Sequence, residues 1–258
     1  MPIRPKSVSP PLEIFKVKLD RAAIDQMPAD ARRNLFLFGH IGNEINTGYR
    51  LLSFSTIKEQ DDPIIAIYGD ARAMTILRFL IGTVFEGYLA VDRSILRSPF
   101  GKNYLPHLKP KGANALKRVK AHLGNMQLIA GIRNAYSFHF PDHAQLDHAY
   151  GRLPADIDVA FYSGEARHSS LYEMSHRIMT CGMLELVPGS DTMTDHQIMA
   201  IIFEDVAQKS VALNSFLEQL FIVIVDRHNL SPEPVQVVTT VDTHHTVKTF
   251  KIPPLLRS

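Results

Sequence analysis

An arginine, an asparagine and a histidine with a spacing suited to phosphate chemistry lie near the middle of the chain. Arg133 and Asn134 precede His139 in a stretch that ends at Pro141. A guanidinium can stabilise the charge that develops on a phosphorane, and an imidazole that titrates near neutral pH can exchange a proton with a 2′-hydroxyl or a leaving oxygen. An arginine beside a histidine is therefore the minimum set of groups for RNA cleavage without a metal ion.

A long helix from about residue 114 is predicted to position these groups. Apolar residues recur along it at three- and four-residue steps and form one row: Leu116, Val119, Leu123, Met126 and Ala130. Arg133 is the next member of this row. A second apolar row reaches His139, so both functional side chains are expected to point toward packed surfaces. Because Pro141 stops the helix, His139 should lie in its last turn, where the helix dipole favours a protonated imidazole.

A buried arginine needs a polar partner, and the first long helix offers two candidates. Asn43 and Glu44 interrupt the apolar flank of that helix. They are expected either near Arg133 or, as the alternative, on a solvated helix face.

Basic residues dominate the approach to this stretch. No acidic residue occurs from residue 93 to residue 141, whereas residues 154 to 228 contain eleven acidic and four basic residues. A surface of this charge attracts a phosphate backbone, and an ordinary solvated face is the alternative explanation. The candidate RNA-binding residues are Lys109, Lys111, Lys117, Arg118 and Lys120.

Composition indicates a soluble cytoplasmic protein. The chain has 258 residues, of which 45% are hydrophobic and 21% charged, enough apolar material for a packed core. Cys181 is the only cysteine and is expected to be a small buried hydrophobe in a reducing compartment. The start of the chain lacks the apolar segment of a signal peptide, and charged residues interrupt the most hydrophobic stretch, from residue 63 to 91, which argues against a membrane span.

The pattern of caps, periodic segments and prolines predicts an all-α fold, an antiparallel bundle of four to five long helices with a small β hairpin or an extended C-terminal tail. Residues 1–29 are expected to form an N-terminal arm with one short helix after Asp20, residues 30–230 the helical bundle, and residues 231–258 a β-like tail. Within the bundle, the segment between Pro99 and Pro110 should be a loop, residues 157–162 a weak strand, and residues 142–150 a short helix. Long helices should begin near residues 30, 63, 114, 169 and 194.

Metal and cofactor chemistry find little support in the sequence. The chain has no glycine-rich phosphate loop after a strand, no Gly-x-Ser-x-Gly elbow and no pair of cysteines. Three nearby histidines form the best metal candidate, but Pro141 lies between the first two and disfavours a continuous helix that presents both to one ion. These histidines are His139, His143 and His148, with Asp142 and Asp147 beside them. We therefore expect no metal and no cofactor.

The stretch from Ile132 to Phe140 resembles the signature of the HEPN superfamily (higher eukaryotes and prokaryotes nucleotide-binding), an arginine, a polar residue and a histidine four to six positions after the arginine. The segment from Phe38 to Asn46 is also similar to the opening helix of bacterial members, and the resemblance spans about residues 30 to 228. It implies an all-helical bundle, a homodimer with the motif at its interface, and in many members metal-independent RNA cleavage in toxin–antitoxin, phage-defence or RNA-processing systems.

Two functions from different classes follow from these observations. In the first, the protein cleaves or binds RNA through Arg133 and His139, with Asn134 orienting the pair, and an antitoxin is a possible partner. In the second, the protein is a non-catalytic helical dimer in which the same residues hold the interface. A small-ligand or nucleotide-binding bundle is the third alternative. The lysine-rich, acid-free approach to the motif favours the first, because an interface alone does not require it.

Overall fold

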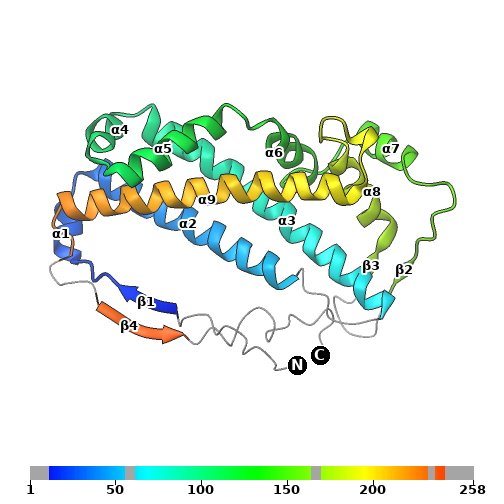
Figure 1. Cartoon of the computed structure of the whole chain (residues 1–258), viewed down its shortest axis with the longest axis horizontal. Helices are drawn as coiled ribbons and strands as arrows, with labels where there is room; N and C mark the ends of the chain where they lie inside the picture. Colours follow the sequence, from blue (N-terminus) through cyan, green and yellow to red (C-terminus); the bar gives the residue numbers. More distant parts are fainter. Residues whose placement is uncertain (1–11, 56–61, 164–169, 232–235, 242–258) are drawn as a thin grey trace, which may run out of the picture.

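Three long helices form the centre of the molecule. The computed structural model describes residues 12–55, 62–163, 170–231 and 236–241. The long helices are α2 (Ala29–Ser55), α3 (Pro63–Val91), which continues into the π-helical turn η1 (Asp92–Leu96), and α9 (Asp195–Arg227). Figure 1 shows α9 running across the molecule in front of α2 and α3. The prediction of an all-α protein is confirmed.

The starts of these helices follow from their capping residues. The carboxylate of Asp62 accepts hydrogen bonds from the backbone N–H groups of Ile64 and Ile65, and Pro63 occupies the first turn. Thr194 caps α9 in a capping box with Gln197. Both boundaries agree with those predicted from the sequence.

The core lies where α3 crosses α2 and α9. The apolar stripe of α9 is buried against α2, α3 and α5. A Cβ atom placed on Gly87 of α3 would lie 3.0 Å from side-chain atoms of both Ile41 in α2 and Leu213 in α9. A glycine at this position lets three helices approach one another closely. The largest fully buried side chains around the crossing include Ile45, Leu77, Ile81, Tyr88 and Phe216.

The segment Pro63–Leu96 is long and apolar enough to cross a membrane by length and composition alone. Half of its most apolar window is buried inside the protein, and the central helix of a water-soluble core has the same composition. This burial is compatible with a soluble protein.

Shorter helices lie along the upper side and one end of the core in Figure 1. They are α4 (Pro99–Tyr104), η2 (Leu105–His107), α5 (Pro110–Leu123), α6 (Gln127–Ile132), the π-helical turn η3 (Arg133–Ser137), α7 (His143–Gly151), α8 (Glu173–Leu184) and η4 (Ser190–Thr192). Two predictions about this part of the chain were wrong. The predicted loop from Pro99 to Pro110 is helical over most of its length, because Ser98 caps a turn that proline can begin. The predicted continuous helix from residue 114 to 139 is broken, since Gly124 ends α5 and residues 124–126 separate it from α6.

The strands are short and join distant parts of the chain. The strand β1 (Leu12–Lys16) pairs antiparallel with β4 (Gln236–Val241), with an irregularity between Ile14 and Phe15. One strand from the predicted N-terminal arm thus pairs with one strand from the predicted C-terminal tail. The predicted turn of a hairpin within the tail lies outside the described residues. Two further strands, β2 (Phe161–Tyr162) and β3 (Leu171–Tyr172), pair antiparallel, so α8 begins at Glu173 rather than near residue 169.

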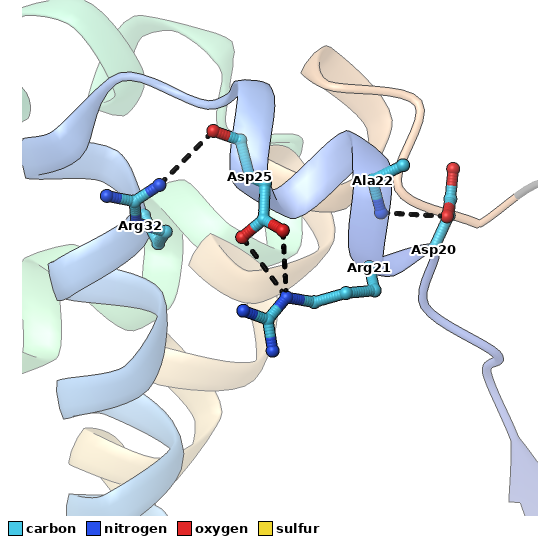
Figure 2. A network of polar contacts seen from close by, with 5 residues as sticks. All are labelled: Asp20, Arg21, Ala22, Asp25 and Arg32. Carbon is cyan, nitrogen blue, oxygen red and sulfur yellow. Dashed lines mark hydrogen bonds and ion pairs between the residues drawn. The ribbon is translucent and has the colours of Figure 1, made fainter.

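The short helix α1 (Arg21–Gln26) connects β1 to the core, as Figure 2 shows. The side chain of Asp20 accepts a hydrogen bond from Ala22 N, and Arg21 Nε donates to both carboxylate oxygens of Asp25. Arg32 of α2 donates to the backbone oxygen of Asp25 at 3.2 Å. The backbone N–H of Asp20 also donates to the carbonyl of Leu230, which fixes the helix to the end of α9. The prediction that Asp20 caps a short helix is confirmed.

Candidate functional site

The residues of the motif lie on η3, directly after α6. Ala135 and Tyr136 are buried and hold this turn against α3 and α8. A π-helical turn adds one residue to each hydrogen-bonded ring and is frequent at functional sites. Of the two positions before this buried pair, Arg133 is partly buried and Asn134 is exposed.

The guanidinium of Arg133 is the centre of a polar cluster. Its Nη1 atom donates to Asn134 Oδ1 at 2.9 Å and lies 3.1 Å from His139 Nε2. Its Nη2 atom donates to Glu86 Oε1 at 2.5 Å, and its Cζ atom lies 5.7 Å from the centre of the Phe85 ring. The structure therefore brings together the three motif residues predicted from the sequence.

The acidic partner of Arg133 is Glu86 of α3. Of the two alternatives given for Asn43 and Glu44, the solvated helix face is confirmed. Glu44 lies on the exposed side of α2, 4.0 Å from His40 in an i, i+4 pair, and Asn43 is exposed too. The sequence did contain a signal for Glu86, which is the only acidic residue between Asp70 and Asp92. A single carboxylate within an apolar helix needs a cation, and that argument would have selected it.

The exposure of His139 differs from the prediction, whereas that of Arg133 agrees with it. The side chain of Arg133 is 24% exposed and packs against α3, but His139 is exposed rather than packed. The regular helix has already ended at Ser137, so His139 follows the last turn instead of belonging to it. Arg133 is the charged group that contacts it.

The contact with Arg133 sets the role of one nitrogen of the His139 ring. A guanidinium only donates hydrogen bonds, so Nε2 is the acceptor in this contact. The lone pair of Nε2 is the group that could later take a proton from a substrate.

A close contact with α3 positions the segment that carries His139. A Cβ atom on Gly82 would lie 2.6 Å from Ser137 Oγ and 2.8 Å from the ring of Phe138. The hydroxyl of Ser137 donates to the backbone oxygen of Arg78 at 2.5 Å. Only glycine at position 82 lets the segment lie this close to α3, and the position of His139 depends on that approach.

The five candidate RNA-binding residues are exposed on α5 or at its start. They follow α5 toward the segment of residues 124–126 that precedes α6 (Figure 1). Lys109 lies 3.6 Å from Asp226 of α9, an exposed pair of small energetic value. They contribute a basic surface on the element before the motif and are not members of the Arg133 cluster.

Three residues of the metal alternative have other partners. Asp142 caps α7 by accepting from Gln145 N, and His148 lies 3.2 Å from Glu185. His139 contacts Arg133, as described above. Within the described ranges, no group of three or more histidine, cysteine or acidic side chains could hold a metal ion.

A second histidine near the site lies in a strongly basic environment. His176 of α8 is half-buried, and burial together with the charges of Arg78 and Arg177 lowers its pKa to about 4. Burial also lowers the pKa of the Arg78 guanidinium, which donates to Thr75 Oγ1 and has no carboxylate partner in the described part of the chain. His176 is therefore neutral at physiological pH.

The lowered pKa of His176 predicts a loss of stability in acid. Between pH 6.5 and pH 4 the unfolded chain protonates this histidine while the folded protein does not, so the free energy of unfolding falls as pH falls, by up to about 3 kcal/mol. Urea denaturation at pH 7 and pH 4.5 measures the effect. The substitution His176→Leu should make the difference between the two pH values clearly smaller, whereas His196→Leu, at an exposed histidine, should leave it unchanged. An unaltered difference in His176→Leu would contradict this prediction.

In comparisons with known proteins, no protein-family model, curated protein or solved structure matches this chain.

Proposed function

We propose that the protein is a HEPN-like, metal-independent RNA-cleaving or RNA-binding protein that acts through Arg133, Asn134 and His139. The observation that carries the proposal is the 3.1 Å contact between Arg133 Nη1 and His139 Nε2, on a guanidinium whose other end is bound by Glu86. The proposal includes an antiparallel bundle, a cytoplasmic location and an interface of two copies around the motif. An antitoxin is a partner class consistent with this function.

The cluster suggests how the two groups would act on RNA. A substrate phosphate would compete with His139 for Arg133 Nη1, which would release the lone pair of Nε2. The imidazole would then accept the proton of the 2′-hydroxyl, whose oxygen attacks the phosphorus, while Arg133 stabilises the phosphorane charge. The 5′-oxygen leaves and takes the proton that the imidazole accepted, so the imidazole is restored. The products are a 2′,3′-cyclic phosphate and a 5′-hydroxyl.

The positions of the other residues support separate roles. Glu86 and Asn134 would hold the guanidinium in place, since each accepts a hydrogen bond from a different terminal nitrogen of Arg133. The basic residues of α5 would attract the RNA backbone and contact it outside the reacting phosphate.

The non-catalytic dimer remains the second candidate, and one observation favours it. Phe138 and Phe140, on either side of His139, are 46% and 94% exposed. Exposed aromatic side chains of this size are typical of protein interfaces. In this alternative, His139 and Arg133 bind across a twofold axis and perform no chemistry.

Cleavage of labelled RNA in excess EDTA separates the two candidates. We expect the wild-type protein to produce cyclic-phosphate ends, and His139→Ala to lower the rate by at least about 100-fold. His143→Ala, at an exposed histidine outside the Arg133 cluster, is the matched control and should retain the wild-type rate. Absence of cleavage across several RNA types, with His139→Ala monomeric or less stable, would favour the non-catalytic dimer.

A further inference from the structure

A large cavity lies apart from the Arg133 cluster, between the first half of α3, the helix α8 and the start of α9. Its volume is about 970 Å³, at the upper end of the range of small-molecule sites. Residues 153–157, which follow α7, close another side. Neither Arg133 nor His139 lines it, so the proposed RNA chemistry leaves this space without a role.

Most of the cavity wall is apolar. Aliphatic, thioether and aromatic side chains from the three helices and the segment after α7 line it, among them Ile67, Met74, Leu153, Leu184, Met199 and Phe203. Binding of an apolar ligand against this wall is favourable, because the apolar surfaces of both the wall and the ligand leave water.

Polar groups line the cavity on several helices, among them Arg72 of α3, and Glu173, His176 and Arg177 lie on α8. Glu173 is 2% exposed and accepts hydrogen bonds from Ala160 N and from Arg177, so its charge is compensated. His176 has no hydrogen-bond partner in the described part of the chain, and its ring lines the cavity. The guanidinium of Arg78 adds a half-buried positive charge near this ring, and no described carboxylate neutralises it.

The local balance of charge at this wall is positive. Arg177 uses Nε and one terminal nitrogen on Glu173 and keeps further N–H groups. Asp70 and Asp195 also line the cavity but are exposed, so water and salt screen their charge. The α8 wall is therefore suited to an anionic group, which needs N–H donors and positive charge when it leaves water.

We propose that this cavity binds a small apolar molecule with one anionic group, whose charge lies against His176 and Arg177 and whose apolar part covers the wall formed by α3 and α9. The imidazole N–H and the guanidinium donate to the anion. A neutral amide of the same shape offers one acceptor oxygen and no charge to balance the guanidinium, and a cation would be repelled.

Three naphthalene derivatives of similar size test the charge preference. Isothermal titration calorimetry of the full chain at pH 7 should give 2-naphthoate a dissociation constant at least about tenfold lower than that of 2-naphthamide, and weaker binding still of 2-naphthylmethylamine. His176→Leu should reduce the preference for naphthoate over the amide several-fold. Equal or tighter binding of the amide or the amine would overturn the proposal.

A substitution that fills the cavity tests the location. Gly69 lies on α3 and lines the cavity, and a Cβ atom there would have no neighbour within 4 Å. Gly69→Phe should therefore fold normally and weaken naphthoate binding by at least about tenfold. Gly39→Phe is the matched control, because Gly39 lies on α2 outside the cavity and is equally free of neighbours. Unchanged binding in Gly69→Phe, or no naphthoate binding to the wild-type protein at millimolar concentration, would also overturn the proposal.

Discussion

Arg133→Lys is expected to lower the rate of RNA cleavage by at least about 100-fold, although it preserves the positive charge. The guanidinium reaches Glu86, Asn134 and His139 at the same time through two terminal nitrogens. The single ammonium of lysine can approach one or two of these groups but cannot reproduce the planar arrangement. The 3.1 Å contact to His139 and the stabilisation of the phosphorane should both be lost.

A conservative substitution of Glu86, the acidic partner of Arg133, should have a smaller effect on the rate of cleavage. Glu86→Gln retains an oxygen that can accept from Arg133 Nη2 and removes only the charge, so we expect a loss of about tenfold. Single-turnover cleavage with labelled RNA measures both variants, beside the control Arg93→Lys at an exposed arginine of η1. Full activity of Arg133→Lys, with its folding verified by circular dichroism, would contradict the proposed role of the guanidinium.

Asp205→Ala is expected to lower the free energy of unfolding by about 3 to 5 kcal/mol at neutral pH. Asp205 forms an ion pair with Lys209, one turn further along α9. The side chain of Lys209 is 1% exposed, while that of Asp205 is 22% exposed. Removal of the carboxylate would leave an ammonium buried in the core without a counter-charge, and the folded state would bear the cost of its desolvation.

The double variant Asp205→Asn/Lys209→Met tests whether the unpaired ammonium causes the loss of stability in Asp205→Ala. It removes both charges, so its free energy of unfolding should return to within about 1 kcal/mol of the wild type. Glu204→Ala, at the exposed neighbouring position, should change stability by no more than about 0.5 kcal/mol. Urea denaturation gives all four values. A double variant as unstable as Asp205→Ala would indicate that packing, rather than the unpaired charge, explains the loss.

The boundaries of the long helices could be predicted because local residues determine them. Asp62 with Pro63, and Thr194 with Gln197, begin helices through side-chain contacts within one turn. The break between α5 and α6 was missed because apolar periodicity continues across Gly124. Whether a glycine ends a helix depends on its tertiary contacts, which the periodicity does not reveal. The π-helical turn η3 was missed for the same reason, and its extra residue per turn changes which side chains share a face.

The candidate site was predictable in part. The sequence spacing identified Arg133, Asn134 and His139, and the structure places them in contact. Glu86 was missed because it lies 47 positions before Arg133 along the chain, and such a contact depends on how α3 packs against η3. The exposure of His139 was also missed, because the periodic pattern assumed a regular helix up to Pro141. The pairing of β1 with β4 could not be predicted for a similar reason, since neither strand has a local partner.

The sheet formed by β1 and β4 has a consequence for the order of assembly. During synthesis, β1 is made before α1 to α9, and its only described partner is made after all of them. The described buried contacts among α2, α3 and α9 join residues that are all made before β4, so these contacts can form while β1 is still unpaired. We expect the sheet to close after them, joining the two ends of the described chain.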